Sequence, residues 1–298
     1  MDIEKRIEDM MRPGHLACPG CGLAIAMRLV LRALGEKTIA IIIPSCSSMI
    51  ASTYPNSALK VPTFHGTFET AAPTAAGISY ALKIKGKNEI SVVTFAGDGG
   101  TFDIGLQSLS GTADRNEHFI YVCLDNEAYM NTGIQASSAT PQYAWTITTP
   151  SGRHGRKKKL MEIIAAHRVP YAATASVGYP QDLMDKVQKA RSIEGTKFIH
   201  ILTPCAIGWR MEESLSVKAA MLAVETRLFP LYEVFDGKKY AVTYDPQGLP
   251  VKEYLQIQGR YRHLSVEQIQ EIQKEVDEEW DTLLKRVTDL PPPLLTHS

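Results

Sequence analysis

An aspartate and an asparagine, each directly after an apolar run, are the residues of this chain best suited to chemistry. Asp98 lies in Gly97-Asp98-Gly99-Gly100, and Asn126 begins Asn126-Glu127-Ala128-Tyr129-Met130-Asn131-Thr132-Gly133. A carboxylate, an amide oxygen and nearby backbone carbonyls are hard oxygen ligands that suit Mg²⁺. Glycines let the backbone approach a phosphate group closely. The two motifs therefore predict a site for Mg²⁺ and a phosphate-bearing cofactor.

Two buried strands and a helix between them would position these motifs. Residues 90–96 and 119–124 are apolar and of strand length, and residues 101–115 can form a crossover helix. The side chains that this helix offers for packing are Ile104, Leu106 and Leu109. Parallel strands joined in this way bring both motifs to one carboxyl edge, where open α/β sheets bind ligands. Gly-Asp-Gly-Gly alone is a common turn sequence, so the flanking strands and the second motif are what favour a cofactor site.

Four of the five cysteines lie beside proline, glycine or serine, in sequences typical of loops. Cys18 and Cys21 form a CxxC pair, Cys46 lies in Pro-Ser-Cys-Ser-Ser, and Cys205 follows a proline. Cys123 lies in an apolar strand and is predicted to be a small buried hydrophobe. Four thiolates satisfy a [4Fe–4S] cluster. Zinc, a disulfide and unrelated thiols are the alternatives, although a zinc ribbon usually has two CxxC pairs and no secretory context supports a disulfide.

Together these motifs resemble the β subunit of 2-oxoacid:ferredoxin oxidoreductases, the subunit that holds thiamine diphosphate and an iron–sulfur cluster. The resemblance is closest to pyruvate:ferredoxin oxidoreductase (pyruvate synthase) and runs from about Pro13 to Tyr232. The spacing of the first two motifs is similar to that of the thiamine-diphosphate motif, in which an Asn follows Gly-Asp-Gly by just under thirty residues. The other segments that match, in family order, are Cys18-Pro-Gly-Cys21-Gly22, Pro44-Ser-Cys46-Ser-Ser48, His65-Gly66, Asp103-Ile-Gly105, Ala166-His167, Pro204-Cys205 and Gly208-Trp209.

The resemblance implies a fold, cofactors and residue roles. The fold is α/β, a mostly parallel sheet flanked by helices, of the thiamine-diphosphate-binding (PP-type) class with a C-terminal arm. The implied ligands of one [4Fe–4S] cluster are Cys18, Cys21, Cys46 and Cys205. The implied ligands of Mg²⁺ are Asp98, Asn126 and the carbonyl of Ala128. The implied catalytic residues are Asn131 and His65. The implied contacts of thiamine diphosphate are Cys46, Ser47, His65, Gly66, Gly97, Asp98, Gly99, Gly100, Asn126, Ala128, Tyr129, Met130, Asn131 and Thr132.

The implied activity is the coenzyme A-dependent oxidative decarboxylation of a 2-oxoacid, reversibly of pyruvate to acetyl-CoA and CO₂. Decarboxylation leaves an acyl carbanion, and the thiazolium ring of thiamine diphosphate supplies the electron sink that it needs. Electrons would pass one at a time through [4Fe–4S] clusters to ferredoxin. Branched-chain oxoacids such as 2-oxoisovalerate, 2-oxoglutarate, oxalate, phenylglyoxylate and indolepyruvate are the alternative substrates within the family. Outside it, the alternatives are a non-redox thiamine-diphosphate decarboxylase and a zinc-binding α/β scaffold.

Partner subunits are also implied by the resemblance. Only the half of the cofactor site that holds the diphosphate is recognisable, between residues 97 and 133. The pyrimidine domain and its activating glutamate would then lie on an α subunit, and γ and δ (ferredoxin-like) subunits or their equivalents would carry electrons onward. Glu69 lies near the site in sequence, but in this family the activating glutamate comes from the other domain.

Composition is consistent with a cytoplasmic enzyme subunit. The 298 residues, 44% of them hydrophobic, suffice for a large core. The 32 basic residues balance 32 acidic ones, which gives no global charge suited to nucleic acid. Residues 1–11 lack the apolar centre of a signal peptide, and runs such as residues 39–43 are too short to cross a bilayer. We therefore expect neither a nucleic-acid nor a membrane partner.

The sequence predicts one α/β domain over residues 1–232 and a partly helical extension over residues 233–298 that packs on a partner subunit. The other predicted helices cover residues 1–11, 23–34, 70–83, 157–167, 180–191 and 266–287, and the other strands cover 39–43 and 198–203. Residues 132–155, rich in Ser, Thr and Pro, are predicted to form a long functional loop. The basic run at residues 156–159 predicts a solvated loop or, alternatively, a docking site for an acidic electron carrier.

Overall fold

An eight-stranded sheet forms the centre of the protein, described here from a computed structural model over residues 9–52 and 55–287. The strand order is β2-β1-β3-β4-β6-β5-β7-β8. The first six strands in this order pair in parallel, and the last two extend the sheet antiparallel at one edge. The strands are β1 (Thr38–Ile42), β2 (Thr63–His65), β3 (Ser91–Gly97), β4 (Phe119–Asp125), β5 (Tyr171–Ser176), β6 (Thr196–Leu202), β7 (Tyr232–Phe235) and β8 (Lys239–Val242).

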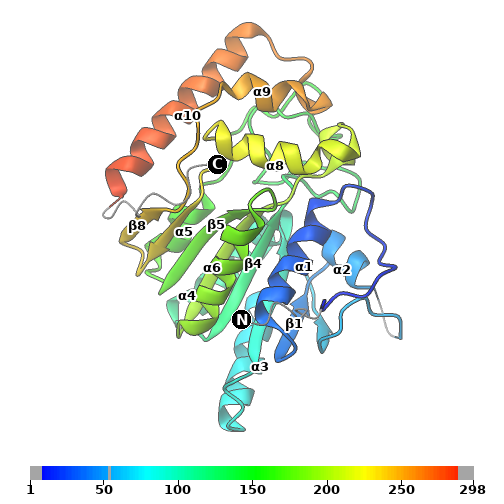
Figure 1. Ribbon diagram of the computed structural model, residues 1–298, viewed down its shortest axis with the longest axis vertical. Coiled ribbons are helices and arrows are strands. Elements are labelled where there is room, and N and C mark those ends of the chain that lie inside the picture. Colours follow the sequence, from blue (N-terminus) through cyan, green and yellow to red (C-terminus); the bar gives the residue numbers. More distant parts are fainter. Residues whose placement is uncertain (1–8, 53–54, 288–298) are drawn as a thin grey trace, which may run out of the picture.

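Helices cover both faces of the parallel strands (Figure 1). Two of them, α1 and α6, share an apolar cluster with one face, and α3, α4 and α5 share another with the opposite face. Strands buried on both faces are mostly apolar, and most of these strands are therefore visible in the sequence as apolar runs. The helices are α1 (Gly22–Leu34), α2 (Cys46–Ala51), α3 (Ala71–Ile84), α4 (Leu106–Asp114), α5 (Leu160–Ala166), α6 (Pro180–Ser192), α7 (Ala206–Trp209), α8 (Ser216–Glu225), α9 (Val251–Gln256) and α10 (Val266–Arg286).

The carboxyl ends of the central strands lie level with one another. Gly97 at the end of β3 pairs with Leu124, and Asp125 at the end of β4 pairs with Leu202. The segments that follow these strands, including the one that carries Cys205, therefore start at the same edge of the sheet. The predicted meeting of the two oxygen-ligand motifs at one edge is confirmed.

The crossover helix predicted over residues 101–115 is two helices in the structure. A π-helix, η1 (Gly100–Ile104), comes first, because the N–H of Gly105 donates to the carbonyl of Gly100, five residues earlier, at 2.9 Å. The α-helix α4 then follows. Leu109 is buried as predicted, but Ile104 is 52% exposed, so its predicted packing is wrong.

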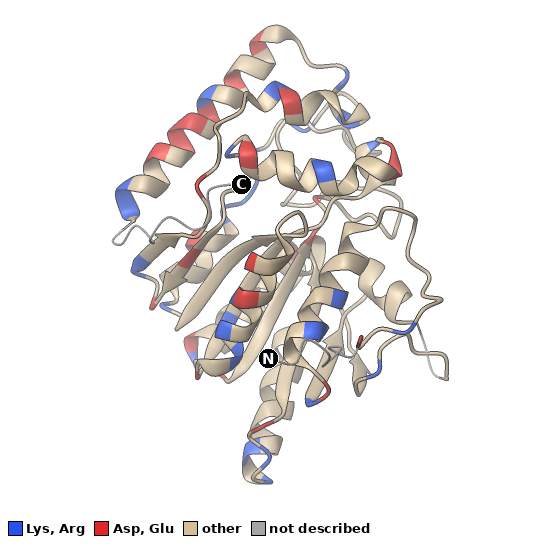
Figure 2. Cartoon of the chain, viewed as in Figure 1, with Lys and Arg blue, Asp and Glu red and all other residues tan. Residues whose placement is uncertain are grey.

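The chain after β6 adds more structure than its sequence pattern indicated. Side chains of α8, α9 and part of α10 form a third apolar cluster with Leu202 and Trp209. The helix predicted over residues 266–287 is confirmed by α10, along which acidic residues recur while the central strands carry few charges (Figure 2). The division predicted after residue 232 falls at the first residue of β7, inside the sheet, and packing of the extension on a partner stays a prediction.

Two further observations concern the ends of the chain and its helices. The short helix predicted over residues 1–11 lies outside the described residues as far as residue 8, and residues 9–11 are not helical. None of the helices in the described parts of the chain has the length and apolar character that a membrane span requires.

Candidate functional site

A cavity of about 60 Å³ opens at the carboxyl edge of β1, β3 and β4. Its walls come from four segments that are far apart in sequence, and they contain most of the predicted contacts of the cofactor. The lining residues are Pro44, Ser45, Cys46, Phe68, Gly97, Asp98, Gly99, Gly100, Asn126, Ala128, Tyr129, Met130, Asn131 and Thr132.

Three oxygen-bearing groups converge in this cavity, from Asp98, Asn126 and Ala128. One end of the side-chain amide of Asn126 lies 2.8 Å from the carbonyl oxygen of Ala128 and 2.9 Å from Oδ1 of Asp98. With nitrogen at that end, the amide donates to both oxygens. With oxygen at that end and Asp98 ionised, three oxygens meet with no donor between them, and a cation would be needed to hold them together.

The carboxyl group of Asp98 is buried, with the residue only 1% exposed. Burial raises its pKa well above the ordinary range, and the nearby charge of Asp125 raises that pKa further. The hydroxyl of Ser137 donates to Oδ2 of Asp98 at 2.5 Å and acts in the opposite direction. A carboxylate in these surroundings is strongly favoured by a cation beside it.

Ser137 is a site residue that sequence reasoning missed. It lies in the long loop over residues 132–155 that was predicted to be functional. That loop carries many Ser and Thr residues, and nothing in its sequence separates Ser137 from the others. Phe68, Pro44 and Ser45 were also missed as lining residues.

Tyr129 packs across the glycine turn and forms one wall of the cavity. A Cβ atom at Gly99 would lie 2.1 Å from Cε1 of the tyrosine ring, so only glycine fits beneath it. The tyrosine hydroxyl donates to Oδ2 of Asp103 at 2.8 Å. Burial and this carboxylate raise the pKa of Tyr129, so its hydroxyl keeps its proton. Gly99 thus serves the packing of the tyrosine as well as any approach of phosphate.

Four cysteines gather beside the cavity, and Cys123 does not belong to them. Burial raises the pKa of Cys46 to about 12, and the neighbouring thiols of Cys205, Cys21 and Cys18 add to the rise. The pKa values of Cys21 and Cys205 are raised in the same way, by burial first and also by the neighbouring cysteines. The fifth cysteine is fully buried in β4, and its charged neighbours are Asp and Lys side chains rather than thiols.

Local structure brings these thiols together. Cys46 is the first residue of α2, whose start is capped by the side chain of Ser45. The N–H of Gly22 donates to the carbonyl of Pro204 at 3.1 Å and joins the CxxC loop to the Cys205 loop. All five cysteines are free, which contradicts a disulfide. It leaves a cluster, zinc and unrelated thiols as the interpretations. Within residues 9–52 and 55–287, no three His, Cys, Asp or Glu side chains are placed to hold a single metal ion.

Three predicted contacts of the cofactor do not line the cavity. His65 is exposed at the end of β2, and the adjacent Gly66 donates its N–H to the carbonyl of Ile42. Ser47 is fully buried behind Cys46, where its hydroxyl lies 2.5 Å from that of Ser45. Roles for these residues at the cofactor stay predictions.

Behind Asn126, two acidic residues point away from the cofactor cavity into a buried charge cluster. Nζ of Lys157 donates to Oδ2 of Asp125 at 2.6 Å and to Oε1 of Glu127 at 3.0 Å. Nη2 of Arg260 donates to Oε2 of Glu127 at 2.6 Å, and Nε2 of His200 lies 2.7 Å from Oδ2 of Asp125. Burial raises the pKa of Asp125, but Lys157 and His200 outweigh it and lower that pKa to about 2.

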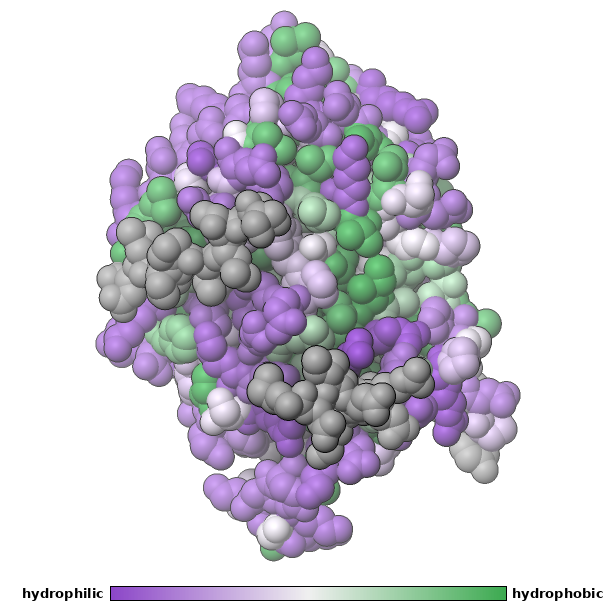
Figure 3. All heavy atoms as spheres, in the orientation of Figure 1, coloured by the Kyte–Doolittle hydropathy of each residue, from purple (hydrophilic) through white to green (hydrophobic). Residues whose placement is uncertain are grey.

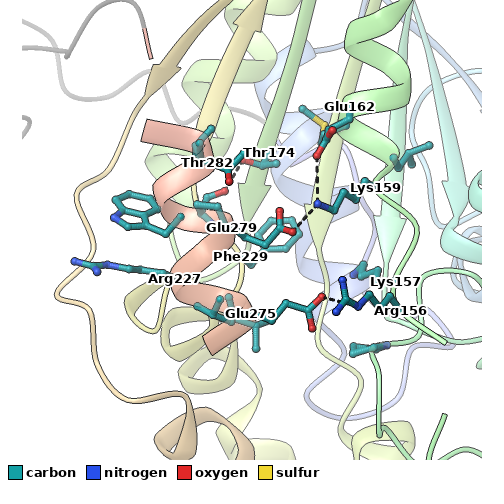
Figure 4. A pocket seen from close by; sticks show the side chains of 18 of the residues that line it. Arg156, Lys157, Lys159, Glu162, Thr174, Arg227, Phe229, Glu275, Glu279 and Thr282 are labelled. Atoms are coloured by element: carbon teal, nitrogen blue, oxygen red, sulfur yellow. Dashed lines mark hydrogen bonds and ion pairs between the residues drawn. The ribbon is translucent and has the colours of Figure 1, made fainter. Parts of the chain in front are cut away.

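The back of this cluster faces a second cavity, of about 290 Å³, between α10 and residues 156–162. Figure 4 shows ion pairs that cross it: Lys159 pairs with Glu279 at 2.5 Å, and Arg156 pairs with Glu275 at 3.5 Å. The side chains of the basic run at residues 156–159 are thus paired within the chain. A solvated loop is wrong for Lys157 and Lys158, whose side chains are 25% and 32% exposed, and fits Arg156 and Lys159, which are exposed at the surface. Docking of an acidic electron carrier at this run stays a prediction.

Comparison with known proteins gives a consistent set of relatives. Residues 44–201 match the family described as thiamine pyrophosphate enzyme, C-terminal TPP binding domain. Pyruvate synthase subunit PorB of Methanothermobacter marburgensis is 50% identical over 276 residues, which cover 91% of this chain and 96% of that protein. Ketoisovalerate oxidoreductase subunit VorB of Pyrococcus furiosus is 46% identical over 300 aligned residues, which cover 95% of this chain and 96% of that protein.

A solved structure shares the fold. The match is to a chain of 2-oxoglutarate:ferredoxin oxidoreductase from Magnetococcus marinus, with a TM-score of 0.59 and 23% sequence identity. The superposed part covers 74% of this chain and 81% of that one.

Proposed function

The chain belongs to the family of 2-oxoacid:ferredoxin oxidoreductase subunits that includes PorB and VorB, and we propose that it joins a thiamine-diphosphate site to a [4Fe–4S] cluster. One observation carries the proposal: Cys46 lines the cofactor cavity and is also a neighbour of the other three thiols. A ligand of the cluster would thus form part of the cofactor site itself. Such an arrangement suits an oxidoreductase and has no purpose in a non-redox decarboxylase.

Asp98, Asn126 and the carbonyl of Ala128 would hold Mg²⁺, and through it the diphosphate. The convergence of these three groups supports this, because a divalent cation could bind the amide oxygen of Asn126 together with the other two oxygens and would remove the cost of burying the Asp98 carboxylate. When bound, thiamine diphosphate supplies a thiazolium ring that accepts electron density during decarboxylation. Tyr129 and Met130 would wall the site, and Asn131 would lie beside the reacting groups.

Cys18, Cys21, Cys46 and Cys205 would ligate the cluster. Each iron of a [4Fe–4S] cluster takes one thiolate, so the four sulfurs stand further apart than around a single ion. The other three thiols are all neighbours of Cys46, and this supports a site made of four thiolates. The buried thiols are neutral in the absence of a metal, and iron would shift them to thiolates.

The substrate that we propose is pyruvate, with 2-oxoisovalerate as the alternative. The relatives support both, since the PorB relative is 50% and the VorB relative 46% identical to this chain. Coenzyme A would accept the acyl group, and ferredoxin would accept the electrons.

Partner subunits are part of the proposal, because the relatives are themselves named as subunits and the family match covers a thiamine-diphosphate domain of one type. An α subunit would supply the pyrimidine domain and its glutamate, and γ and δ subunits or their equivalents would take the electrons. Apolar residues gather on the face that carries α1 and α8 (Figure 3). Exposed apolar side chains also lie within three residues of three of the cysteines in the sequence: Leu16, Met49 and Ile207. We assign this surface to a partner subunit.

Anaerobic purification of the complex tests the function. We expect a broad visible absorption that bleaches with dithionite, and a higher kcat/KM for pyruvate than for 2-oxoisovalerate, 2-oxoglutarate, oxalate, phenylglyoxylate or indolepyruvate, in each case dependent on coenzyme A. A better result with 2-oxoisovalerate would support the alternative substrate. A colourless complex that contains zinc would refute the proposal.

A further inference from the structure

Asn126, the proposed metal ligand, has a buried carboxylate on each side of it in the chain. Asp125 is 0% and Glu127 1% exposed, and neither lines the cofactor cavity. Side chains alternate in direction at the end of a strand, so Asn126 faces the cavity while its two neighbours face the opposite way. Residues 125–128 therefore form a turn with a cofactor side and a charged back side.

The backbone of this turn is held in a conformation that few residues adopt. Glu127 has a φ of +69°, in the left-handed region that is costly for a side chain of this size. Its N–H donates to Oδ1 of Asp125 at 2.9 Å, and its carbonyl accepts from the hydroxyl of Thr140 at 2.7 Å. Glu127 lies between Asn126 and Ala128. Its backbone conformation therefore determines how the side chain of Asn126 meets the carbonyl of Ala128.

Lys157 connects both ends of the back side. Its Nζ atom donates to Asp125 and to Glu127, and its side chain is only 25% exposed, toward the larger cavity. Of the two carboxylates of the turn, Arg260 contacts only that of Glu127, and His200 contacts only that of Asp125. In the described part of the chain, Lys157 is the one cation that spans the turn.

We propose that Lys157 is a positioning residue for the cofactor metal: it clamps the carboxylates on either side of Asn126 and so fixes the turn that presents Asn126 and Ala128 to Asp98. This inference rests on the proposed function, since it assumes that these groups bind Mg²⁺. Without Lys157, Asp125 and Glu127 repel each other in a buried place, and the left-handed conformation loses a clamp.

The sign of the effect distinguishes a clamp from a charge. Lys157 is a cation close to the metal site, so removing its charge would by itself strengthen the binding of Mg²⁺. Losing the geometry of the turn weakens binding. A fall in Mg²⁺ affinity after substitution therefore reports the positioning role.

The test is a calorimetric titration of Mg²⁺ into the purified complex at saturating thiamine diphosphate. We expect Lys157→Met to lower Mg²⁺ affinity by about 10- to 100-fold, the usual effect of losing a group that orients a metal ligand. Lys157→Arg, which can still reach both carboxylates, should restore most of that affinity. If Lys157→Met does not assemble, Lys157→Gln, whose amide can donate to one carboxylate, provides the same comparison.

Lys186 supplies the matched control. It is 2% exposed and pairs with Asp182 at 2.7 Å, but it contacts no residue of the turn. Lys186→Met should lower the melting temperature and leave Mg²⁺ affinity unchanged. The proposal is overturned if Lys157→Met behaves like Lys186→Met, with stability lost and Mg²⁺ affinity retained. If the unsubstituted complex binds thiamine diphosphate without Mg²⁺, the cofactor site itself is wrong and the role of Lys157 falls with it.

Discussion

Asp98 is a carboxylate in a place where an ionised carboxylate is costly. It is almost fully buried, and the nearest charge of its own sign, on Asp125, is held ionised by Lys157 and His200. The protein alone therefore favours a protonated Asp98, and a bound cation favours the ionised form. Binding of a metal ion at this site would therefore be coupled to the deprotonation of Asp98.

Substitution of this residue should have effects of opposite sign with and without metal. The folded protein without metal keeps a proton on Asp98 that the unfolded chain releases above about pH 3.9, so its stability falls as the pH rises between those two pKa values. Asp98→Asn removes this cost and should raise the melting temperature at neutral pH by about 2–4 °C, roughly 1 kcal/mol.

With Mg²⁺ and thiamine diphosphate added, the same variant should show no ligand-induced stabilisation, because the anionic ligand is gone. Thermal unfolding of both proteins, with and without the ligands, checks both statements. Ligand-induced stabilisation of Asp98→Asn equal to that of the unsubstituted protein would refute the site.

The cysteines give a second prediction for single residues. Alanine at Cys18, Cys21, Cys46 or Cys205 should remove or convert the cluster, whereas Cys123→Ala should retain it, because Cys123 lies in β4 away from the other thiols. Iron and sulfide content after anaerobic purification is the measurement. Loss of iron from the Cys123 variant alone would show that the ligands are assigned wrongly.

Among the elements, α10 is attached in two different ways. Apolar side chains of Val276, Trp280 and Leu283 are buried beneath it, while ion pairs such as Lys159 with Glu279 lie at the surface, where both side chains are about half exposed. The guanidinium group of Arg227 also lies over the Trp280 ring, 5.1 Å from its centre. Buried apolar area contributes far more to stability than exposed ion pairs do.

We therefore expect Trp280→Ala to lower the free energy of unfolding by about 3 kcal/mol and Glu279→Gln by less than ~1 kcal/mol. Urea unfolding measures both variants. Equal losses would mean that the ion pairs, and not the apolar contacts, hold α10 in place.

The elements also show how far the sequence could predict the fold. Strands β1, β3 and β4 are largely apolar runs, and β6 is apolar from Phe198 onward except at His200, so these strands were predictable from the sequence. Strand β5, with the sequence Tyr-Ala-Ala-Thr-Ala-Ser, is equally buried but is built from small residues that are as frequent in helices. Strands β7 and β8 are four residues each, too short for a period to appear.

The same limit applies to the site. Asp98, Asn126 and the cysteines lie in short motifs, so local sequence was enough to find them. Ser137 and Lys157 reach the site from other loops, and only the fold sets their contacts. The basic run appeared solvated because its acidic partners lie elsewhere in the chain, 30 residues away for Glu127 and 120 for Glu279.

For the molecule as a whole, the proposed function implies that this chain holds only half of the cofactor site. We propose that the chain provides the half that binds the diphosphate and the metal, and its relatives are named as subunits. We expect the chain alone, loaded with thiamine diphosphate, Mg²⁺ and cluster, to show no turnover of pyruvate with coenzyme A and an acceptor dye. Activity should appear when the partner subunits are added. Steady turnover by the isolated chain would show that its active site is complete.

Cys18 is the one exposed cysteine of this chain. Dioxygen in the solvent can therefore reach the four neighbouring thiols through Cys18. A thiolate at the surface is the first to be oxidised, and a cluster that loses one ligand loses iron. The partner that we place over Leu16, Met49 and Ile207 would close this entrance while it carries electrons away. Dissociation of the complex in air would then do lasting damage, because the surface uncovered on separation is also the weakest point of the cluster site.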